Sequence, residues 1–230
     1  MCIRDRIRGV LFTKQLSFRI LIKPWLCPLD CANKLKTISA QKNILVDAEV
    51  PETFPSDFAI YDLNKMLGVM SLFQDPELEI GEKTMNIGGK VDGDGTTVYM
   101  FADPAMIVTP PEKELAFPDP EVSFKMTDHE FNQTIKAASM LGLPHVCMVG
   151  NGSKITLEAT DVNNSSSDEF KTEVGDTDKT FRMIFKIENL KLYSGDYNVE
   201  ITSKGISKFS HKSTNLQYFI ATESDSTFGG

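Results

Sequence analysis

The sequence motifs of common enzymes are missing from this chain of 230 residues. It contains neither a GxGxxG dinucleotide fingerprint nor a GxxxxGK[ST] phosphate-binding loop, and it has no GxSxG nucleophile elbow. The histidines, His129, His145 and His211, lie far apart in the sequence, and none belongs to an HExxH motif. The many carboxylates are explained by a solvated acidic surface, and no acid-base pair stands out among them. We therefore predict a protein that is not an enzyme and has no cofactor.

Cysteine is also scarce, with four residues in the chain. Cys2, Cys27 and Cys31 lie near the amino terminus, and only Cys147 lies in the remainder, so the spacing does not indicate a disulfide framework. Cys27 and Cys31 would supply half of a metal site, but no second Cys or His pair follows at the spacing of zinc ligands. We predict no metal site.

No apolar run is long enough to cross a membrane. The most apolar stretch, Val10–Leu26, is interrupted by Lys14, Arg19 and Lys23, whereas a spanning helix needs about 20 apolar residues. The same charges break the core of a signal peptide. Two interpretations of the atypical leader, residues 1–33, stay open: a transit peptide, which its basic composition faintly favours, and an artefact of reading frame or assembly. The remainder has no targeting signal, which predicts a cytoplasmic protein without a membrane partner.

Basic charge is in deficit over most of the chain. Residues 1–42 hold nine Lys or Arg and two Asp or Glu, which gives a formal charge of +7. Residues 43–230 hold fifteen Lys or Arg and thirty Asp or Glu, which gives a formal charge of -15. Proteins that bind nucleic acid tightly usually carry a basic excess, because Lys and Arg neutralise phosphates. Any role on DNA must therefore work without a tight basic grip.

The length fits two domains of about 100 residues each. Residues 104–120 are rich in proline and have no apolar periodicity, which predicts an extended connector over residues 107–120. The prolines are Pro104, just before the connector, and Pro110, Pro111, Pro118 and Pro120 within it. The predicted organisation is the leader, an incomplete amino-terminal domain over 34–106, the connector, and a carboxyl-terminal domain over 121–230.

Short strands dominate both predicted domains, since β-branched and alternating apolar residues recur between turn residues. The predicted strands are 35–39, 44–50, 77–80, 84–87, 96–102, 122–126, 145–150, 154–159, 169–174, 180–187, 197–202, 207–211 and 217–222.

Three helices are predicted among these strands. Asp62 is a good N-cap for a helix of about three turns that ends near Phe73. Thr127 and Glu130 have the spacing of a capping box at the start of a second helix. A short third helix is predicted over Glu188–Tyr193. The expected buried positions of the second helix are Phe131, Ile135, Ala138 and either Leu141 or Gly142.

An internal repeat connects the two domains. Phe58–Leu67 and Met183–Leu192 each combine an apolar strand with the start of a helix, and three strands follow each copy. Such self-similarity is typical of repeated supersecondary units. A chance likeness of two strand-helix junctions is the alternative.

Lysines recur on the polar faces of the predicted helices. Lys65, Lys136 and Lys191 project from such faces, and Lys125 and Lys186 precede two of the helices. Ordinary solvation explains each lysine singly. Together they would form a thin basic layer if the helices shared one side of the molecule.

Several extended segments resemble the sliding clamps of large myovirus-type phages, the processivity factors of phage DNA polymerases. The resemblance covers residues 34–230 in order. It rests on DFAIYDLNKMLGVMSLF (57–73), TVYMFADP (97–104), FKIENLKLYSGDYNVEI (185–201) and FIATESDS (219–226).

This resemblance implies an α+β DNA-clamp fold, with two similar domains that each carry helices on one face of antiparallel sheets. It implies a homotrimeric ring that encircles duplex DNA and tethers the replicative DNA polymerase in the cytoplasm of the infected bacterial host. An ATP-driven clamp loader and late transcription factors are the further partners that it implies. The DNA-facing candidates are Lys65, Lys125, Lys136, Lys186 and Lys191.

The resemblance also implies edge-to-edge pairing of subunits, with 96–101 of one chain against 169–174 of its neighbour. The interface candidates are Val98, Met100, Phe170, Thr172 and Val174. A groove for hydrophobic partner peptides would lie beside the connector, and its candidates are Leu115, Phe117, Tyr218 and Ile220. Core packing is the alternative role for each groove residue.

The leader departs from the family pattern, which places a strand, a helix and another strand before Leu35. A β-rich structural phage protein, such as a tail or baseplate component, is the alternative function, because repeats and an acidic surface suit it too. An enzyme with an unrecognised site is a more distant alternative.

Overall fold

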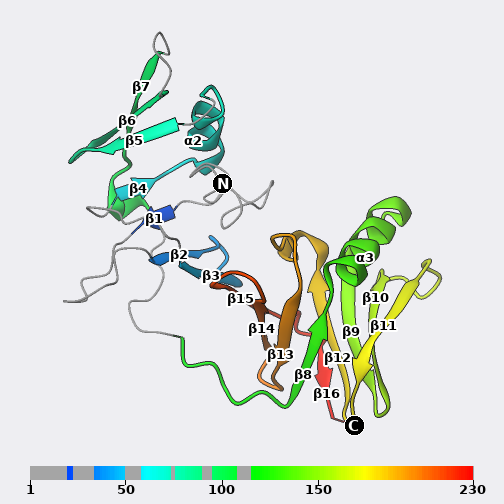
Figure 1. Cartoon of the computed structure of the whole chain (residues 1–230). Helices are drawn as coiled ribbons and strands as arrows, with labels where there is room; N and C mark the ends of the chain where they lie inside the picture. Colours follow the sequence, from blue (N-terminus) through cyan, green and yellow to red (C-terminus); the bar gives the residue numbers. More distant parts are fainter. Residues whose placement is uncertain are drawn as a thin grey trace. The chain divides into compact units, whose positions relative to one another are not determined.

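The chain forms two compact units, residues 1–114 and 115–230 (Figure 1). The structure is a computed structural model that describes residues 20–22, 34–49, 58–73, 76–89, 95–107 and 115–229. The predicted leader, apart from Ile20–Ile22, lies outside the described residues, as do residues 108–114 of the predicted connector. Within the described ranges, no helix has the length and apolar character needed to cross a membrane.

The described part of the first unit consists of short antiparallel pairings, one α-helix and the 3-10 turn η1 (Pro104–Met106). β1 pairs with β4, β2 pairs with β3, and a separate sheet has the order β5-β6-β7. The elements are β1 (Ile20–Ile22), β2 (Lys34–Ile38), β3 (Ile44–Glu49), β4 (Phe58–Ile60), α2 (Leu63–Met70), β5 (Pro76–Ile80), β6 (Thr84–Gly89) and β7 (Thr96–Met100).

Helix α2 begins where the sequence predicts. The Asp62 side chain caps it by accepting a hydrogen bond from the Lys65 backbone N–H at 3.0 Å. Met66 and Met70 are fully buried on its inner face. The Tyr99 hydroxyl of β7 donates to the Asp62 carbonyl at 3.2 Å, so a hydrogen bond joins the start of the helix to the last strand of the β5-β6-β7 sheet.

The second unit contains two antiparallel sheets and helix α3. One sheet has the order β11-β10-β9-β12-β16, and the other strands of this unit follow the order β15-β14-β13-β8. The elements are β8 (Val122–Met126), α3 (Asp128–Leu141), β9 (His145–Asn151), β10 (Lys154–Thr160), β11 (Phe170–Asp176), β12 (Thr180–Lys186), the 3-10 turn η2 (Ile187–Asn189), β13 (Tyr197–Ile201), β14 (Ile206–His211), β15 (Leu216–Ala221) and β16 (Thr227–Phe228).

The core of the second unit lies between these sheets. On β8, Val122 and Met126 are buried while Lys125 is exposed, which is the alternation that the sequence predicts. The ring of Phe185 on β12 meets that of Phe209 on β14 edge to face, with the centroids 6.0 Å apart. The two sheets therefore pack on each other through apolar side chains.

Helix α3 has the predicted capping box. The Thr127 hydroxyl accepts from the Glu130 backbone N–H, and the Glu130 carboxylate accepts from the Thr127 N–H at 2.7 Å. The buried face differs in part from the prediction. Phe131 and Ala138 are buried, but Ile135 is only half-buried.

The prediction that Leu141 or Gly142 is buried is wrong, because both are exposed. Gly142 ends the helix in the left-handed conformation with φ 66°. The chain turns there, and Leu143 packs against Ala138 instead.

The predicted third helix is also wrong. In place of a helix over Glu188–Tyr193, the structure has the 3-10 turn Ile187–Asn189 followed by an irregular segment. Asn189 and Leu190 are buried, which anchors the segment without a helical face. The internal repeat therefore holds for the strands, but only its first copy continues into an α-helix.

Candidate nucleic-acid interface and assembly surfaces

Helix α3 presents an exposed stripe on the side opposite its buried residues. His129, Gln133, Lys136 and Met140 follow one another at spacings of four, three and four residues, and all are exposed. The Lys136 ammonium group is therefore held on the outer face of a capped helix, where it can meet a phosphate without disturbing the core.

Two of the other predicted DNA-facing lysines are likewise exposed. Lys65 lies on the outer face of α2, in the first unit. Lys125 lies on the exposed face of β8, opposite Asn198 of β13. Regular elements hold both backbones, so only the side chains need to order on a charged ligand.

Lys186 and Lys191 lie in a different environment. The Lys186 Nζ is 3.1 Å from the Glu223 carboxylate, so its charge is partly compensated. Exposed ion pairs of this kind contribute little to stability and exchange readily with other partners. Lys191 lies on the irregular segment rather than on a helix, and its partial burial lowers the pKa of its ammonium group.

Asp128 joins the first turn of α3 to this irregular segment. Its carboxylate accepts hydrogen bonds from the Gly195 N–H at 2.6 Å and the Ser194 hydroxyl at 2.9 Å. The Asp128 N–H in turn donates to the Asp196 carboxylate at 3.0 Å. A carboxylate at a helix amino terminus also complements the helix dipole. The position of the segment that carries Lys191 is thus fixed to α3.

His211 holds the same segment from the other side. Its Nδ1 accepts from the backbone N–H groups of Ser213 and Thr214, each at 3.1 Å. Nδ1 is therefore unprotonated in this arrangement, which assigns the ring proton to Nε2, 3.2 Å from the Ser194 carbonyl. Gly195 lies at the Nε2 edge of the ring with φ +145°, and a Cβ atom there would clash with Nε2.

Gly195→Ala is expected to destabilise the protein. Overpacking against His211 should cost about 1–3 kcal/mol, in addition to the strain of a conformation that L side chains rarely adopt. Gly152→Ala is the matched control, since Gly152 also has a positive φ, +83°, but the nearest atom to its added Cβ lies 3.8 Å away. Urea denaturation should show a larger loss for Gly195→Ala. Equal losses would show that the His211 contact contributes nothing.

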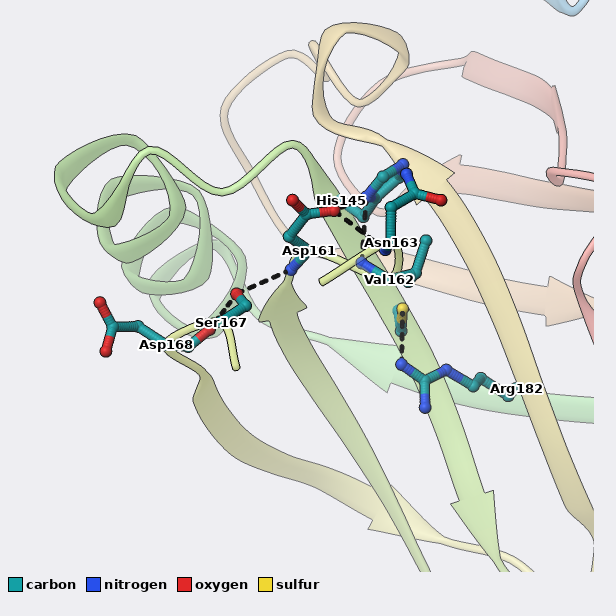
Figure 2. Close-up of polar contacts among 8 residues, drawn as sticks. His145, Asp161, Val162, Asn163, Ser167, Asp168 and Arg182 are labelled. Carbon is teal, nitrogen blue, oxygen red and sulfur yellow. Dashed lines mark hydrogen bonds and ion pairs between the residues drawn. The ribbon is translucent and has the colours of Figure 1, made fainter. Parts of the chain in front are cut away.

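A buried histidine organises the turn that leads into β11 (Figure 2). The His145 Nδ1 accepts from the Val162 N–H at 3.4 Å and lies 3.8 Å from the Asp161 carboxylate. Asp161 also accepts from the Asn163 N–H at 3.0 Å, and its own N–H donates to the Ser167 hydroxyl at 3.2 Å. These bonds stabilise the turn, and they explain its many polar residues without a ligand.

Among the described residues, a further chemically reactive group is the thiol of Cys147, which lies near Arg182; Figure 2 labels Arg182. Arg182 Nη2 lies 3.9 Å from its sulfur, but burial outweighs this charge and raises the pKa of the thiol. A protonated, buried thiol is a poor nucleophile. The described ranges contain no group of three or more His, Cys, Asp or Glu that could hold a metal ion.

The predicted partner-peptide residues divide into two layers. Leu115 is exposed, and the Phe117 ring lies half-buried with its centroid 5.9 Å from that of Phe219 on β15. The Lys208 Nζ lies 5.8 Å from the centre of the Phe117 ring and 3.1 Å from the Glu200 carboxylate. A small apolar surface with a charged border therefore lies on the outer side of β14 and β15.

Tyr218 and Ile220 form the lower layer, because both are buried. The Tyr218 hydroxyl accepts from the Tyr193 N–H at 3.2 Å. Burial raises the pKa of Tyr218 to about 12. Their assignment to a peptide site stays a prediction, and in this structure they support the sheet from within.

The predicted interface strands both lie at sheet edges. In the described part of each unit, β7 and β11 have a strand partner on one side only. Val98 and Met100 on β7 are 61% and 66% exposed. The three candidates on β11 are half-buried; they are Phe170, Thr172 and Val174. Exposed apolar side chains on an open strand edge are typical of a pairing surface.

Comparison with solved structures places the fold among the DNA clamps. The chain matches PCNA from Thermococcus kodakaraensis with a TM-score of 0.67 at 15% identity, covering 96% of this chain and 95% of that one. It matches the DNA polymerase III subunit beta sliding clamp from Bartonella birtlesii with a TM-score of 0.70 at 12% identity, covering 96% of this chain and 63% of that one. The predicted α+β clamp fold is confirmed.

Sequence relatives identify the branch of this class. The family model described as "gp45 sliding clamp, C terminal" matches residues 123–224. The sliding clamp of Vibrio phage KVP40 is 32% identical over 202 residues, which are 85% of this chain and 89% of the relative. The sliding clamp of Enterobacteria phage T4 is 27% identical over 189 residues, with 79% and 81% covered. The chain belongs to the phage sliding clamp family, which confirms the predicted resemblance and the prediction of a protein that is not an enzyme.

Proposed function

We propose that this protein is the processivity factor of a phage replicative DNA polymerase and acts as a homotrimeric ring around duplex DNA. The observation that carries the proposal is the combination of its family with helices whose outer faces present Lys65 and Lys136. A closed ring keeps the polymerase on its template by topology, so the clamp needs no tight grip on DNA. It would act in the cytoplasm of the infected bacterial host.

The charge distribution supports a sliding contact. The chain carries a formal charge of -8, so its surface as a whole repels DNA. A few lysines on the DNA-facing side would supply weak, sequence-independent contacts that exchange as the ring moves. The residues proposed for this role are Lys65, Lys125, Lys136, Lys186 and Lys191.

The edge strands support ring closure. Pairing β7 of one subunit with β11 of the next uses two different surfaces, and such a heterologous contact makes a ring when the rotation closes. Val98 and Met100 would then meet the neighbour near the three β11 candidates, which are Phe170, Thr172 and Val174. Closure also removes the open edges from solvent.

Native mass spectrometry tests the assembly directly. The expected spectrum is dominated by three copies of the chain with no open-ended series. A stable monomer, or a ladder of masses without a limit, would overturn the ring.

The partners proposed for this ring are the replicative polymerase, an ATP-driven clamp loader and late transcription factors. Short hydrophobic peptides of such partners would bind at the surface formed by Leu115 and Phe117, with Phe219 below it. Tyr218 and Ile220 would support this surface from within the sheet.

Phe117→Ala is expected to weaken the binding of a polymerase-tail peptide by at least about tenfold, the loss typical of a central aromatic contact. The change removes the ring that packs on Phe219. Gln217→Ala is the matched control, because Gln217 is an exposed residue of β15, the strand that carries Phe219. Fluorescence anisotropy with a labelled peptide measures both. Equal affinity of the Phe117→Ala variant and the control would remove Phe117 from the site.

A further inference from the structure

The last residues of the chain lie along the outer edge of β12. Figure 1 shows β16, in red, beside β12 at the end of the five-stranded sheet. The register sets Thr227 opposite Arg182 and Phe228 opposite Phe181. The rings of Phe181 and Phe228 stack with their centroids 5.8 Å apart and an interplanar angle of 11°. We call residues 223–229 the tail.

The tail satisfies the backbone groups that β12 would otherwise present to another strand. The Gly229 N–H donates to the Thr180 carbonyl at 2.8 Å, and the Glu223 N–H donates to the Ile184 carbonyl at 2.8 Å. The Ile184 N–H donates to the Ser226 hydroxyl at 2.9 Å, so a side chain replaces a backbone acceptor at this point. The ion pair of Glu223 with Lys186 adds a further link.

Little of this contact serves the core. Ser224, Asp225, Thr227 and Gly229 are exposed, and Phe228 is only half-buried. The tail thus covers a strand edge while contributing little buried apolar area. Unprotected edges are pairing sites for other chains, and proteins commonly cover them.

The opposite edge of the same sheet is β11, which has no outer strand partner in the described part of the chain. The sheet therefore ends in the seven-residue strand β11 at one edge and in the two-residue strand β16 at the other, and so short an edge strand is a poor template for pairing. If the seven-residue strand β12 were the edge instead, a second copy could pair with β12 as readily as with β11, and the two modes of association would compete.

We propose that the tail is an assembly guard that prevents a second copy of this chain from pairing with β12 and thereby leaves β11 as the single subunit-pairing edge of this sheet. The part that concerns β11 rests on the proposed ring, whereas the part that concerns β12 stands on the hydrogen bonds of the tail. With the guard in place, subunits associate in one orientation, and the ring closes without side products.

The test uses a tail-release variant of the full chain, Ser226→Ala with Gly229→Pro. It removes the acceptor for the Ile184 N–H and the donor to the Thr180 carbonyl. Hydrogen exchange at the Ile184 amide should become at least about tenfold faster, and native mass spectrometry should show concentration-dependent species that the unaltered chain lacks. Ser224→Ala is the control, because its hydroxyl reaches only the neighbouring Asp225.

The same release is repeated in a chain whose β7 edge is blocked by Val98→Glu and Met100→Glu. There the intact tail should give monomers, and the released tail should give pairs joined through β12.

Trimers in the blocked chain with its intact tail would count against the proposed ring interface but not against the guard. Faster exchange at Ile184 without new species, or unchanged exchange, would overturn the guard. Gly229→Pro alone serves if the double variant fails to fold, and it should shift both readouts in the same direction.

Discussion

Lys136→Glu is expected to shorten the lifetime of the loaded clamp on DNA and to reduce its salt dependence. Each subunit would lose a phosphate contact and gain a repulsive charge. The slope of log retention against log salt should fall by roughly 0.9 for each phosphate contact that is lost. Folding should be unaffected, because Lys136 is exposed on a helix whose buried residues lie on the other side. Retention on closed circular DNA at several salt concentrations measures the effect.

Lys204→Glu is the control for this experiment. It makes the same change in charge at an exposed lysine in the turn between β13 and β14, at the opposite end of β13 from Lys125. If both variants lose the same amount of retention, net charge rather than position explains the effect, and Lys136 does not face DNA.

Val98→Glu combined with Met100→Glu is expected to dissociate the ring. Both side chains are exposed in the isolated unit, so the change should leave the folded subunit intact. In the assembly, the new carboxylates would be desolvated beside β11, which carries the exposed Glu173 and is preceded by the exposed Glu169. Desolvated or like charges at an interface cost several kcal/mol, so we expect subunit affinity to fall by more than about 100-fold. Sedimentation velocity should show monomers at concentrations where the unaltered chain is a trimer.

Leu72→Glu provides the control for the interface variant. Leu72 is an apolar residue that is 74% exposed, and it lies after α2 rather than on β7. The control should remain trimeric. A trimer in the double Glu variant would show that β7 is not a subunit-pairing edge.

Most strands and helix starts could be predicted from the sequence, because strand alternation and helix caps depend only on residues that are close together in the chain. The alternation of Val122, Phe124 and Met126 marks a half-buried strand wherever it packs, and the structure confirms it. The Thr127–Glu130 capping box and the Asp62 N-cap are confirmed for the same reason, since a cap is made within one helical turn. These signals, with the family resemblance, were enough for the clamp fold.

Elements that depend on distant residues could not be predicted. The segment after β12 has an apolar pattern that favours a helix, but Asp128 and His211 hold it in an irregular path around Gly195. The tail strand was missed because Thr227 and Phe228 form too short a run to predict β structure. The hydroxyl of Ser226, which replaces a backbone acceptor, has no signature in the local sequence.

The candidate sites were predictable to different degrees. Helical spacing assigns Lys65 and Lys136 to polar faces, and both are exposed. Tyr218, Phe219 and Ile220 are all buried, and spacing alone could not show that Phe219 is the one that packs on Phe117. The pairing of Lys186 with Glu223 also joins residues far apart in the sequence.

The central claim, retention on DNA by topology, is tested most directly by loading the clamp with its loader and ATP onto closed circular DNA and then cutting the circle once. The labelled clamp should persist on the uncut circle and be lost from the cut molecule by sliding off its ends. Equal retention, or equal loss, on circular and linear DNA would contradict the account.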